Sequence, residues 1–314
     1  MPIKLPKDFP ARKRLLESGI NSLEFERAEN QEIRPLRIVL FNLMPTKVNT
    51  ETQILRLLST SSIQIEPYFL KTESYQPTHF SKHLDRFYIN FSDIKDKQFD
   101  ALIITGAPVE EINFEDVKYW DEFVEIKKWA NKNVFATLHI CWGASAGLYV
   151  DFGIEKIIAN KKLFGIFPYQ VLMHNRLTAG FDDTVMIPQS RWFRENHQQL
   201  RKAITGGKLM ELVGSTQLQT EDNKPLPQAN ILATPNLRKS YILGHLEYTR
   251  NTLLEEYLRD VEANKENITV PENYFYNNEP GQKIAVTWSS TARIFFINWI
   301  DFIYQETPYN LKDL

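Results

Sequence analysis

Short apolar runs separated by polar or amphipathic stretches dominate the first half of the chain. Residues 36–43 (LRIVLFNL), 99–105 (FDALIIT) and 134–140 (VFATLHI) are rich in β-branched and bulky side chains, which is typical of buried strands. Residues 63–70 (IQIEPYFL) form a fourth run, in which Pro67 indicates a sheet edge or a bulge because proline has no N–H to donate. We predict four strands in this half.

Segments compatible with helices lie between these strands. Apolar side chains within 119–129 recur at helical spacing between charged residues, which predicts an amphipathic helix. Residues 50–58 indicate another helix, with Thr50 as its N-cap and Gln53 completing a capping box. Residues 142–149 (WGASAGLY) are rich in small residues and helix-compatible. This alternation predicts an α/β fold with a doubly wound, mainly parallel sheet, whose ligand sites lie beyond the carboxyl ends of the strands.

The second half of the chain is less regular. Helices are predicted over 249–263 and 291–304. The strand candidates are 164–172, 184–187, 209–213, 230–233 and 240–243. Since no linker separates the halves, we expect one elaborated domain over residues 1–314, with an N-terminal arm over about residues 1–35.

Composition removes several classes of protein. Hydrophobic residues make up 43% and charged residues 24% of the chain, so a disordered protein is excluded. The formal net charge of −2 argues against nucleic acid as the main partner, because phosphate binding needs a basic surplus. There is no apolar run long enough for a signal peptide or a membrane span, so we expect a cytoplasmic protein with no membrane partner.

The chain has a single cysteine, Cys141, which excludes intramolecular disulfides, iron–sulfur clusters and cysteine-rich zinc sites. Cys141 follows the run 134–140, and the residues after it are mostly small. A strand-to-helix turn of this kind is typical of a nucleophile elbow, and the helix N-terminus favours a thiolate. The alternative is a buried structural thiol, because free cysteines are among the most buried residues.

A thiol nucleophile needs a base, and the base needs a group that orients it. His245 follows an apolar run, and an extended backbone there places His245 and Glu247 on one side, so that Glu247 can fix the imidazole tautomer. His83 and Asp85 have the same spacing but lie in the polar segment 71–97, where a solvated face is expected. His139 is interpreted as a core histidine. No ligand spacing supports a metal site.

Several motifs occur along the chain. They are EIRPLR (32–37), NLMP (42–45), TGAP (105–108), CW (141–142), FDD (181–183), PQSR (188–191), GHLEY (244–248), LRD (258–260) and TPY (307–309). Together they resemble the homoserine O-acyltransferases of methionine biosynthesis, from one end of the chain to the other. The resemblance implies a flavodoxin-like sheet similar to that of the class I glutamine amidotransferases. It also implies transfer of an acetyl or succinyl group from coenzyme A to the γ-hydroxyl of L-homoserine.

The resemblance also implies roles for individual residues. Cys141 matches the acyl-thioester nucleophile, His245 the proton acceptor and Glu247 its partner. The remaining matches are Lys162 as a substrate-binding lysine, Ser190 as a substrate-specificity residue and Arg259 as the residue that binds the homoserine carboxylate. Without the resemblance, these three would be interpreted as a surface charge, a turn serine and half of a helix pair with Glu255.

The position that sets acyl specificity falls on Glu110. The resemblance implies glycine there in enzymes that use succinyl-CoA. A glutamate fills that space and repels the succinyl carboxylate, so acetyl-CoA is the expected donor. The neighbouring Glu111 is expected to point elsewhere. This sequence departs from the family pattern at Leu246, where proline is more usual, and in a longer loop over 217–228.

The implied mechanism is double displacement through an acetyl thioester on Cys141, with no bound cofactor and acetyl-CoA as co-substrate. The backbone N–H groups of Trp142 and Val109 are the candidate oxyanion donors, since Pro108 has none. L-Homoserine and acetyl-CoA are the expected partners, and a homodimer is compatible with the sequence. The alternatives are a homoserine O-succinyltransferase, a hydrolase like the glutamine amidotransferases, and a cofactor-binding module with a buried thiol.

Overall fold

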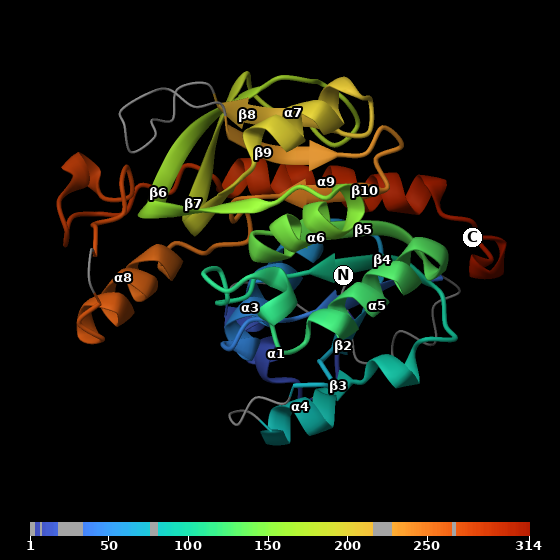
Figure 1. Ribbon diagram of the computed structural model, residues 1–314. Coiled ribbons are helices and arrows are strands. Elements are labelled where there is room, and N and C mark those ends of the chain that lie inside the picture. The colour runs from blue at the N-terminus through green and yellow to red at the C-terminus, as the bar shows by residue number, and fades with distance from the viewer. Residues whose placement is uncertain (1–3, 7, 18–33, 76–80, 216–227, 266–267) are drawn as a thin grey trace.

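The computed structural model describes residues 4–6, 8–17, 34–75, 81–215, 228–265 and 268–314 (Figure 1). Residues 32 and 33 of the first motif and residues 217–227 of the predicted longer loop lie outside these ranges. Within the predicted N-terminal arm, residues 10–17 form helix α1 (Pro10–Glu17), which the sequence pattern did not predict.

Six strands form the parallel part of one ten-stranded sheet. In spatial order they are β3 (Tyr88–Ile89), β2 (Ile65–Leu70), β1 (Leu36–Phe41), β4 (Phe99–Ile104), β5 (Val134–Ile140) and β10 (Lys239–Ile242). The four strands predicted in the first half are confirmed. The order β2-β1-β4-β5 is that of flavodoxin-like sheets, so the predicted α/β class is confirmed as well.

Four antiparallel strands extend the sheet beyond β10. In spatial order they are β9 (Gln228–Ala233), β8 (Met210–Ser215), β6 (Lys156–Val171) and β7 (Thr184–Glu195). The last two are longer than predicted, so that Lys162 and Ser190 both lie within strands. The sheet therefore joins strands from both halves of the chain, and the single-domain organisation stays a prediction.

Helices cover both faces of the parallel part. Side chains of α3 (Lys47–Leu58) and α9 (Ser289–Glu306) pack with Ile38 and Leu40 in one core, together with α1. On the other face, α5 (Trp120–Asn133) and α6 (Trp142–Phe152) pack with Val39 and Phe41. Successive side chains of β1 thus point to opposite faces of the sheet, as expected for a strand that is buried on both faces.

The other helices lie at the margins of these layers. They are α4 (Ser81–Phe87), α7 (His197–Thr205), α8 (Thr252–Glu262) and the 3₁₀ turns Phe91–Asp93, Phe114–Asp116, Tyr276–Asn278 and Leu311–Asp313. Figure 1 shows α8 apart from the layered helices, on the same side of the molecule as β6 and β7. None of the helices in the described ranges is long and apolar enough to cross a membrane.

Two local predictions in the first half are wrong. Helix α3 begins at Lys47, so Thr50 lies inside it and its hydroxyl donates to the Thr46 carbonyl (3.3 Å) instead of capping the helix. His83 is not on a solvated face: it lies on α4, and its Nε2 is 2.8 Å from an Oε1 of the buried Glu51. In both cases packing of the helix against the sheet overrides the local signal.

Two other predictions are confirmed. Within the described residues, the short β3 pairs only with Phe69 and Leu70 of β2. At Pro67, therefore, β2 has no neighbouring strand on its β3 side and is an edge there. His139 is a fully buried core histidine, with Nδ1 3.0 Å from the Ser240 carbonyl and Nε2 2.7 Å from Lys127 Nζ. Burial and the Lys127 amine hold the pKa of His139 well below its usual value, so this imidazole is neutral.

Candidate active site

Cys141 lies at the junction between β5 and α6, as the sequence predicts. Its backbone has a φ of 51° and a ψ of −117°, a region that L-residues rarely occupy. Its N–H donates to the Ile242 carbonyl (2.7 Å), which ties the turn to the end of β10. The residue is therefore held in a strained conformation of the kind found at nucleophile elbows.

Glycine at position 143 makes this turn possible, and Gly106 lies beside it. A Cβ on Gly143 would lie 2.5 Å from the Thr105 carbonyl oxygen, a backbone atom that cannot move aside. A Cβ on Gly106 would lie 3.4 Å from Cys141 Cβ and 3.9 Å from its Sγ. The first turn of α6 thus packs directly on the loop that follows β4, and this loop passes beside the sulfur.

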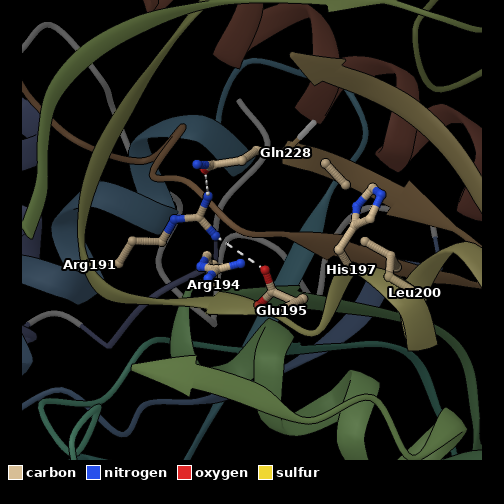
Figure 2. A pocket seen from close by; sticks show the side chains of 7 residues that line it. Arg191, Arg194, Glu195, His197, Leu200 and Gln228 are labelled. Carbon is tan, nitrogen blue, oxygen red and sulfur yellow. Dashed lines mark hydrogen bonds and ion pairs between the residues drawn. The ribbon is translucent and has the colours of Figure 1, made fainter. Parts of the chain in front are cut away.

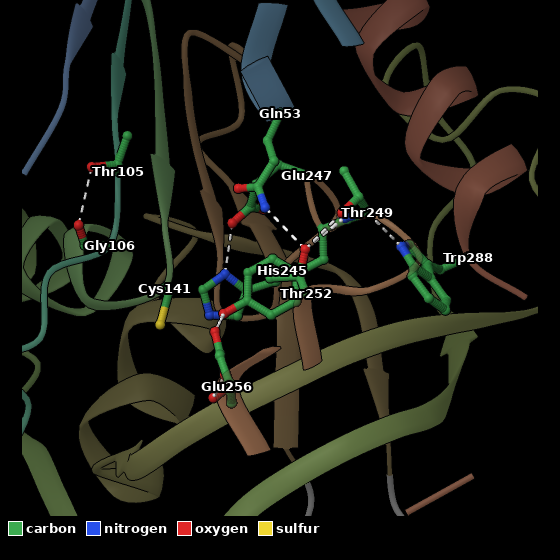
Figure 3. Close-up of polar contacts among 12 residues, drawn as sticks. Gln53, Thr105, Gly106, Cys141, His245, Glu247, Thr249, Thr252, Glu256 and Trp288 are labelled. Atoms are coloured by element: carbon green, nitrogen blue, oxygen red, sulfur yellow. Dashed lines mark hydrogen bonds and ion pairs between the residues drawn. The ribbon is translucent and has the colours of Figure 1, made fainter. Parts of the chain in front are cut away.

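His245 and Glu247 arrive from the segment that follows β10. The His245 N–H donates to the Pro188 carbonyl (2.9 Å), and its ring stacks on Tyr248 with centroids 4.1 Å apart. Its Nδ1 lies 2.6 Å from Glu247 Oε1, so the predicted histidine–carboxylate contact exists. Figure 3 shows the imidazole between Glu247 and Cys141. The carboxylate fixes the tautomer that leaves Nε2 for the sulfur.

Cys141 and His245 are both buried, and each shifts the pKa of the other. Burial raises the pKa of the Cys141 thiol, and the charge of His245 and its hydrogen bond to the thiol oppose that rise. Burial lowers the pKa of His245, but interaction with the Cys141 sulfur and with the Glu247 carboxylate outweighs it and raises the pKa well above its usual value. The two groups therefore titrate as a coupled pair and not independently.

A second cation, Arg191, also acts on the sulfur. Its guanidinium is 1% exposed, with one nitrogen 3.3 Å from Glu195 Oε2 and another donating to Gln228 Oε1 (3.1 Å), around a small pocket that Figure 2 shows. The positive charge of Arg191 lowers the pKa of the Cys141 thiol. Sequence reasoning quoted Arg191 only as part of a motif and assigned it no role.

Glu110 lies on the loop after β4, next to Cys141. Cys141 Sγ is 3.9 Å from its Oε1, and the Trp192 N–H donates to its Oε2 (3.0 Å). Burial raises the pKa of Glu110, while the Trp192 N–H and the charges of His245 and Lys162 oppose the rise. The adjacent Glu111 is exposed, so it points elsewhere, as predicted.

Lys162 and Arg259 both contact the carboxylate of Asp260. Lys162 Nζ lies 3.5 Å from Asp260 Oδ2, and Arg259 donates twice to Asp260 Oδ1 (3.1 and 3.2 Å). Lys162 is largely buried and covers the Phe164 ring at 4.1 Å, so the surface-charge interpretation is wrong. The Arg259 side chain is 60% exposed, and its ion-pair partner is Asp260, where the helix-pair interpretation expected Glu255.

Ser190 joins the same region through a second acid. Its hydroxyl donates to Glu256 Oε2 (2.6 Å), and the Tyr248 hydroxyl donates to Glu256 Oε1 (2.5 Å). Since Tyr248 stacks on His245, Ser190 is connected to the imidazole through Glu256 and Tyr248. Nothing in the sequence singled out Glu256, because its position depends on how α8 packs beside β7.

The two candidate oxyanion donors meet one requirement for their role. Among the hydrogen bonds of the described residues, none has the N–H of Trp142 or of Val109 as its donor, so neither amide is committed to the sheet. The Trp142 N–H belongs to the first residue of α6, where helix N–H groups lack partners inside the helix. Their function in stabilising an oxyanion stays a prediction.

These groups together suit acyl transfer. The Cys141 thiol contacts the His245 imidazole, which in turn contacts the Glu247 carboxylate. Cations and acids next to these groups can bind a charged substrate. In the part of the chain that the structure describes, no three His, Cys, Asp or Glu side chains are arranged to hold a metal ion. The chemistry available to these residues is nucleophilic catalysis by the sulfur.

Comparison with known sequences gives matches over the full chain. The model of the homoserine O-succinyltransferase family matches residues 2–309. A protein of Clostridium botulinum named homoserine O-acetyltransferase is 44% identical, with 100% of this chain and 99% of that protein covered. Proteins of the same name from Clostridium acetobutylicum and Streptococcus pneumoniae are 43% and 42% identical, over 99% and 100% of this chain and 100% and 97% of theirs.

Comparison with solved structures gives the same fold at low identity. A glutamine amidotransferase of Thermotoga maritima superposes with a TM-score of 0.55 at 10% identity, covering 87% of this chain and all of the other. A glutamine amidotransferase of Methylobacillus flagellatus gives 0.52 at 11% identity, covering 89% and 99%. At such identity the likeness shows the fold alone, which is the architecture predicted from the sequence.

The strain at Cys141 predicts an inverted order of stability between two variants. At an ordinary helix position glycine is about 1 kcal/mol less stable than alanine. At Cys141 the positive φ favours glycine, so we expect Cys141→Gly to be more stable than Cys141→Ala by about 1 kcal/mol. Urea unfolding of the two purified variants measures the difference.

Ser145 is the matched control, because it is buried inside the same helix and has helical geometry. There we expect the ordinary order, with Ser145→Gly less stable than Ser145→Ala by about 1 kcal/mol. If glycine were the less stable residue at both positions, the strain assigned to Cys141 would be ruled out.

Proposed function

The chain belongs to the homoserine O-succinyltransferase family, and from this premise we propose that it transfers an acetyl group from acetyl-CoA to the γ-hydroxyl of L-homoserine. The full-length relatives named homoserine O-acetyltransferase support the acceptor and the reaction type. The reaction is a step of methionine biosynthesis. We place it in the cytoplasm, where the single thiol stays reduced.

The position of Glu110 carries the proposal of acetyl-CoA as donor. Its carboxylate occupies the space beside Cys141 Sγ and is fixed there by the Trp192 N–H. An acetyl group on the sulfur ends in a methyl and fits in front of this carboxylate. A succinyl group would carry a second carboxylate into the same buried space, where two like charges repel strongly.

In the first half-reaction, Cys141 Sγ attacks the thioester carbonyl of acetyl-CoA while His245 holds the thiol proton. The carbon–sulfur bond to coenzyme A breaks, and His245 returns the proton to the departing coenzyme A thiolate. Exchange of one thioester for another is nearly isoenergetic, so the acetyl-enzyme is not a thermodynamic trap. The N–H groups of Trp142 and Val109 stabilise the oxyanion that forms on the way.

In the second half-reaction, the γ-hydroxyl oxygen of homoserine attacks the acetyl carbon and its proton passes to His245. The bond between that carbon and Sγ then breaks, and the sulfur recovers its proton from the imidazolium. Glu247 stabilises the imidazolium at both stages through its contact with Nδ1. Arg259 binds the homoserine carboxylate, while Lys162 and Ser190 complete the substrate site.

Initial-rate kinetics with homoserine and each acyl-CoA tests the function. We expect parallel double-reciprocal lines, a clear preference for acetyl-CoA over succinyl-CoA, and the mass of one acetyl group added at Cys141 when homoserine is left out. Intersecting lines would contradict double displacement, and a preference for succinyl-CoA would give the family's other activity. Release of ammonia from glutamine in place of acetyl transfer would point to an amidotransferase-like hydrolase.

Substitution of Glu247 tests the catalytic pair. Glu247→Gln removes the carboxylate charge that raises the His245 pKa. The state in which the Cys141 thiol and the His245 imidazolium are both protonated becomes less stable, so it loses its first proton at lower pH. We expect the acid limb of the pH profile of kcat/KM for acetyl-CoA to shift to lower pH. The misoriented imidazole lowers kcat by about 10²- to 10⁴-fold. An acid limb that stays in place or moves upward would exclude this role of Glu247.

Substitution of Glu110 tests donor selection. Glu110→Gly removes the side chain beside the sulfur, so the ratio of kcat/KM for succinyl-CoA to that for acetyl-CoA is expected to rise by about 10- to 100-fold. Glu111→Gly is the matched control, because it removes the same charge from an exposed neighbour and leaves the ratio unchanged. Equal effects of the two variants would show that charge in the loop, and not space at Glu110, selects the donor.

A further inference from the structure

A large cavity lies beside the nucleophile, and we propose that it binds the pantetheine arm and the nucleotide of the coenzyme A donor. Its volume is about 390 Å³. The proposal rests on the proposed function, which requires an acyl-CoA but does not say where the part of the molecule remote from the thioester lies. That part is elongated, with a flexible amide chain at one end and an adenine and phosphates at the other.

The topology of the sheet puts the cavity at a preferred ligand position. Connections from β1 lead to β2 on one side, while β4 lies on the other side, so the loops after β1 and β4 diverge at the carboxyl end of the sheet. In open α/β sheets this switch point is where ligands bind. The cavity is lined there by residues 42–45 after β1 and by Pro108 and Val109 after β4.

Met44 brings the inner end of the cavity near the Cys141 sulfur. Met44 lines both this cavity and the smaller pocket that His245 and Glu247 line. Both Met44 Sδ (3.8 Å) and Cys141 Sγ (3.9 Å) lie close to the point where a Cβ on Gly106 would be. Val109, the second candidate oxyanion donor, is in the same wall. A thioester at Cys141 can therefore continue past Met44 into the cavity.

The outer wall suits an adenine ring and phosphates. Tyr75 is 40% exposed and its ring centroid lies 6.1 Å from that of Tyr119. The exposed Lys118 holds its amine 5.5 Å from the centre of the Tyr75 ring, so an aromatic face and a cation are presented together. Asp116, the acidic residue of this wall, is paired with the Asn113 amide (3.0 Å). Adenine stacks on Tyr75, and Lys118 faces the phosphates.

Homoserine has a separate place in the proposed reaction. The groups assigned to it, Lys162, Ser190 and Arg259, come from β6, β7 and α8, and none of them lines the cavity. The cavity is also larger than a small amino acid needs, since its volume falls within the usual range for pockets that hold larger ligands. The donor and the acceptor thus approach the sulfur from different elements of the fold.

Comparison of a whole donor with a truncated donor tests the proposal. S-acetyl-N-acetylcysteamine has the thioester end of acetyl-CoA but no nucleotide. We expect Lys118→Glu to raise the KM for acetyl-CoA about fivefold, since attraction of a phosphate becomes repulsion, and Tyr75→Ala to raise it about tenfold. Neither variant is expected to change kcat/KM for the truncated donor or the KM for homoserine.

Lys128→Glu is the matched control, because Lys128 is exposed on α5 and does not line the cavity, while the change in net charge is the same. An unchanged KM for acetyl-CoA in both cavity variants would overturn the proposal, as would an equal loss with the truncated donor.

Calorimetry with coenzyme A on Cys141→Ala, with and without Lys118→Glu, tests binding without any reaction. We expect the added Lys118→Glu to weaken coenzyme A binding about fivefold. Equal binding of coenzyme A to Cys141→Ala and to the variant that also carries Lys118→Glu would contradict the cavity proposal. The proposed function is contradicted by a different result, the absence of acetyl transfer by the natural enzyme.

Discussion

The contact between the first turn of α6 and the loop after β4 is the constraint on which the candidate site depends. Because a side chain on Gly143 would lie 2.5 Å from the Thr105 carbonyl, only glycine lets the two backbones meet. The chain reaches this position by turning sharply at Cys141, whose positive φ is the local cost of that approach. The turn places the sulfur beside the β4 loop, which carries both Glu110 and the Val109 amide. A shift of α6 would therefore move Cys141, the space beside Glu110 and the candidate oxyanion donors together.

Buried charges are concentrated around this turn, and each has a partner that limits its cost. His245 is held by Glu247, Glu110 by the Trp192 amide, and Arg191 by Glu195 and Gln228. In a site excluded from water these interactions are stronger than on the surface, which is why the Cys141 and His245 pKa values are coupled. The same environment is what the proposed role of Glu110 in donor selection depends on, since a second negative charge beside its carboxylate would be poorly screened.

The sequence was most informative where local pattern and tertiary packing agree. Strands β1, β4 and β5 are buried on both faces, so their apolar runs stand out, and the Cys141 junction follows from the small residues after β5. It was least informative where packing overrides the local pattern. Thr50 resembles a cap but lies inside α3, and His83 resembles a surface residue but contacts the buried Glu51. Lys162 looked like a surface charge because the sequence did not show that β6 begins at Lys156.

The sequence by itself determined the class of fold, the single available thiol and a histidine–carboxylate pair with the correct local spacing. His245 and Glu247 are two residues apart, and such a contact depends on short-range geometry that a sequence can reveal. Only the tertiary structure decided which distant groups meet the sulfur. The contacts of Ser190 with Glu256, of Arg191 with Gln228 and of Glu110 with Trp192 join strands, helices and loops far apart in the chain. Their formation depends on the register of the sheet and the packing of α8, which arise from the core as a whole and leave no local signal.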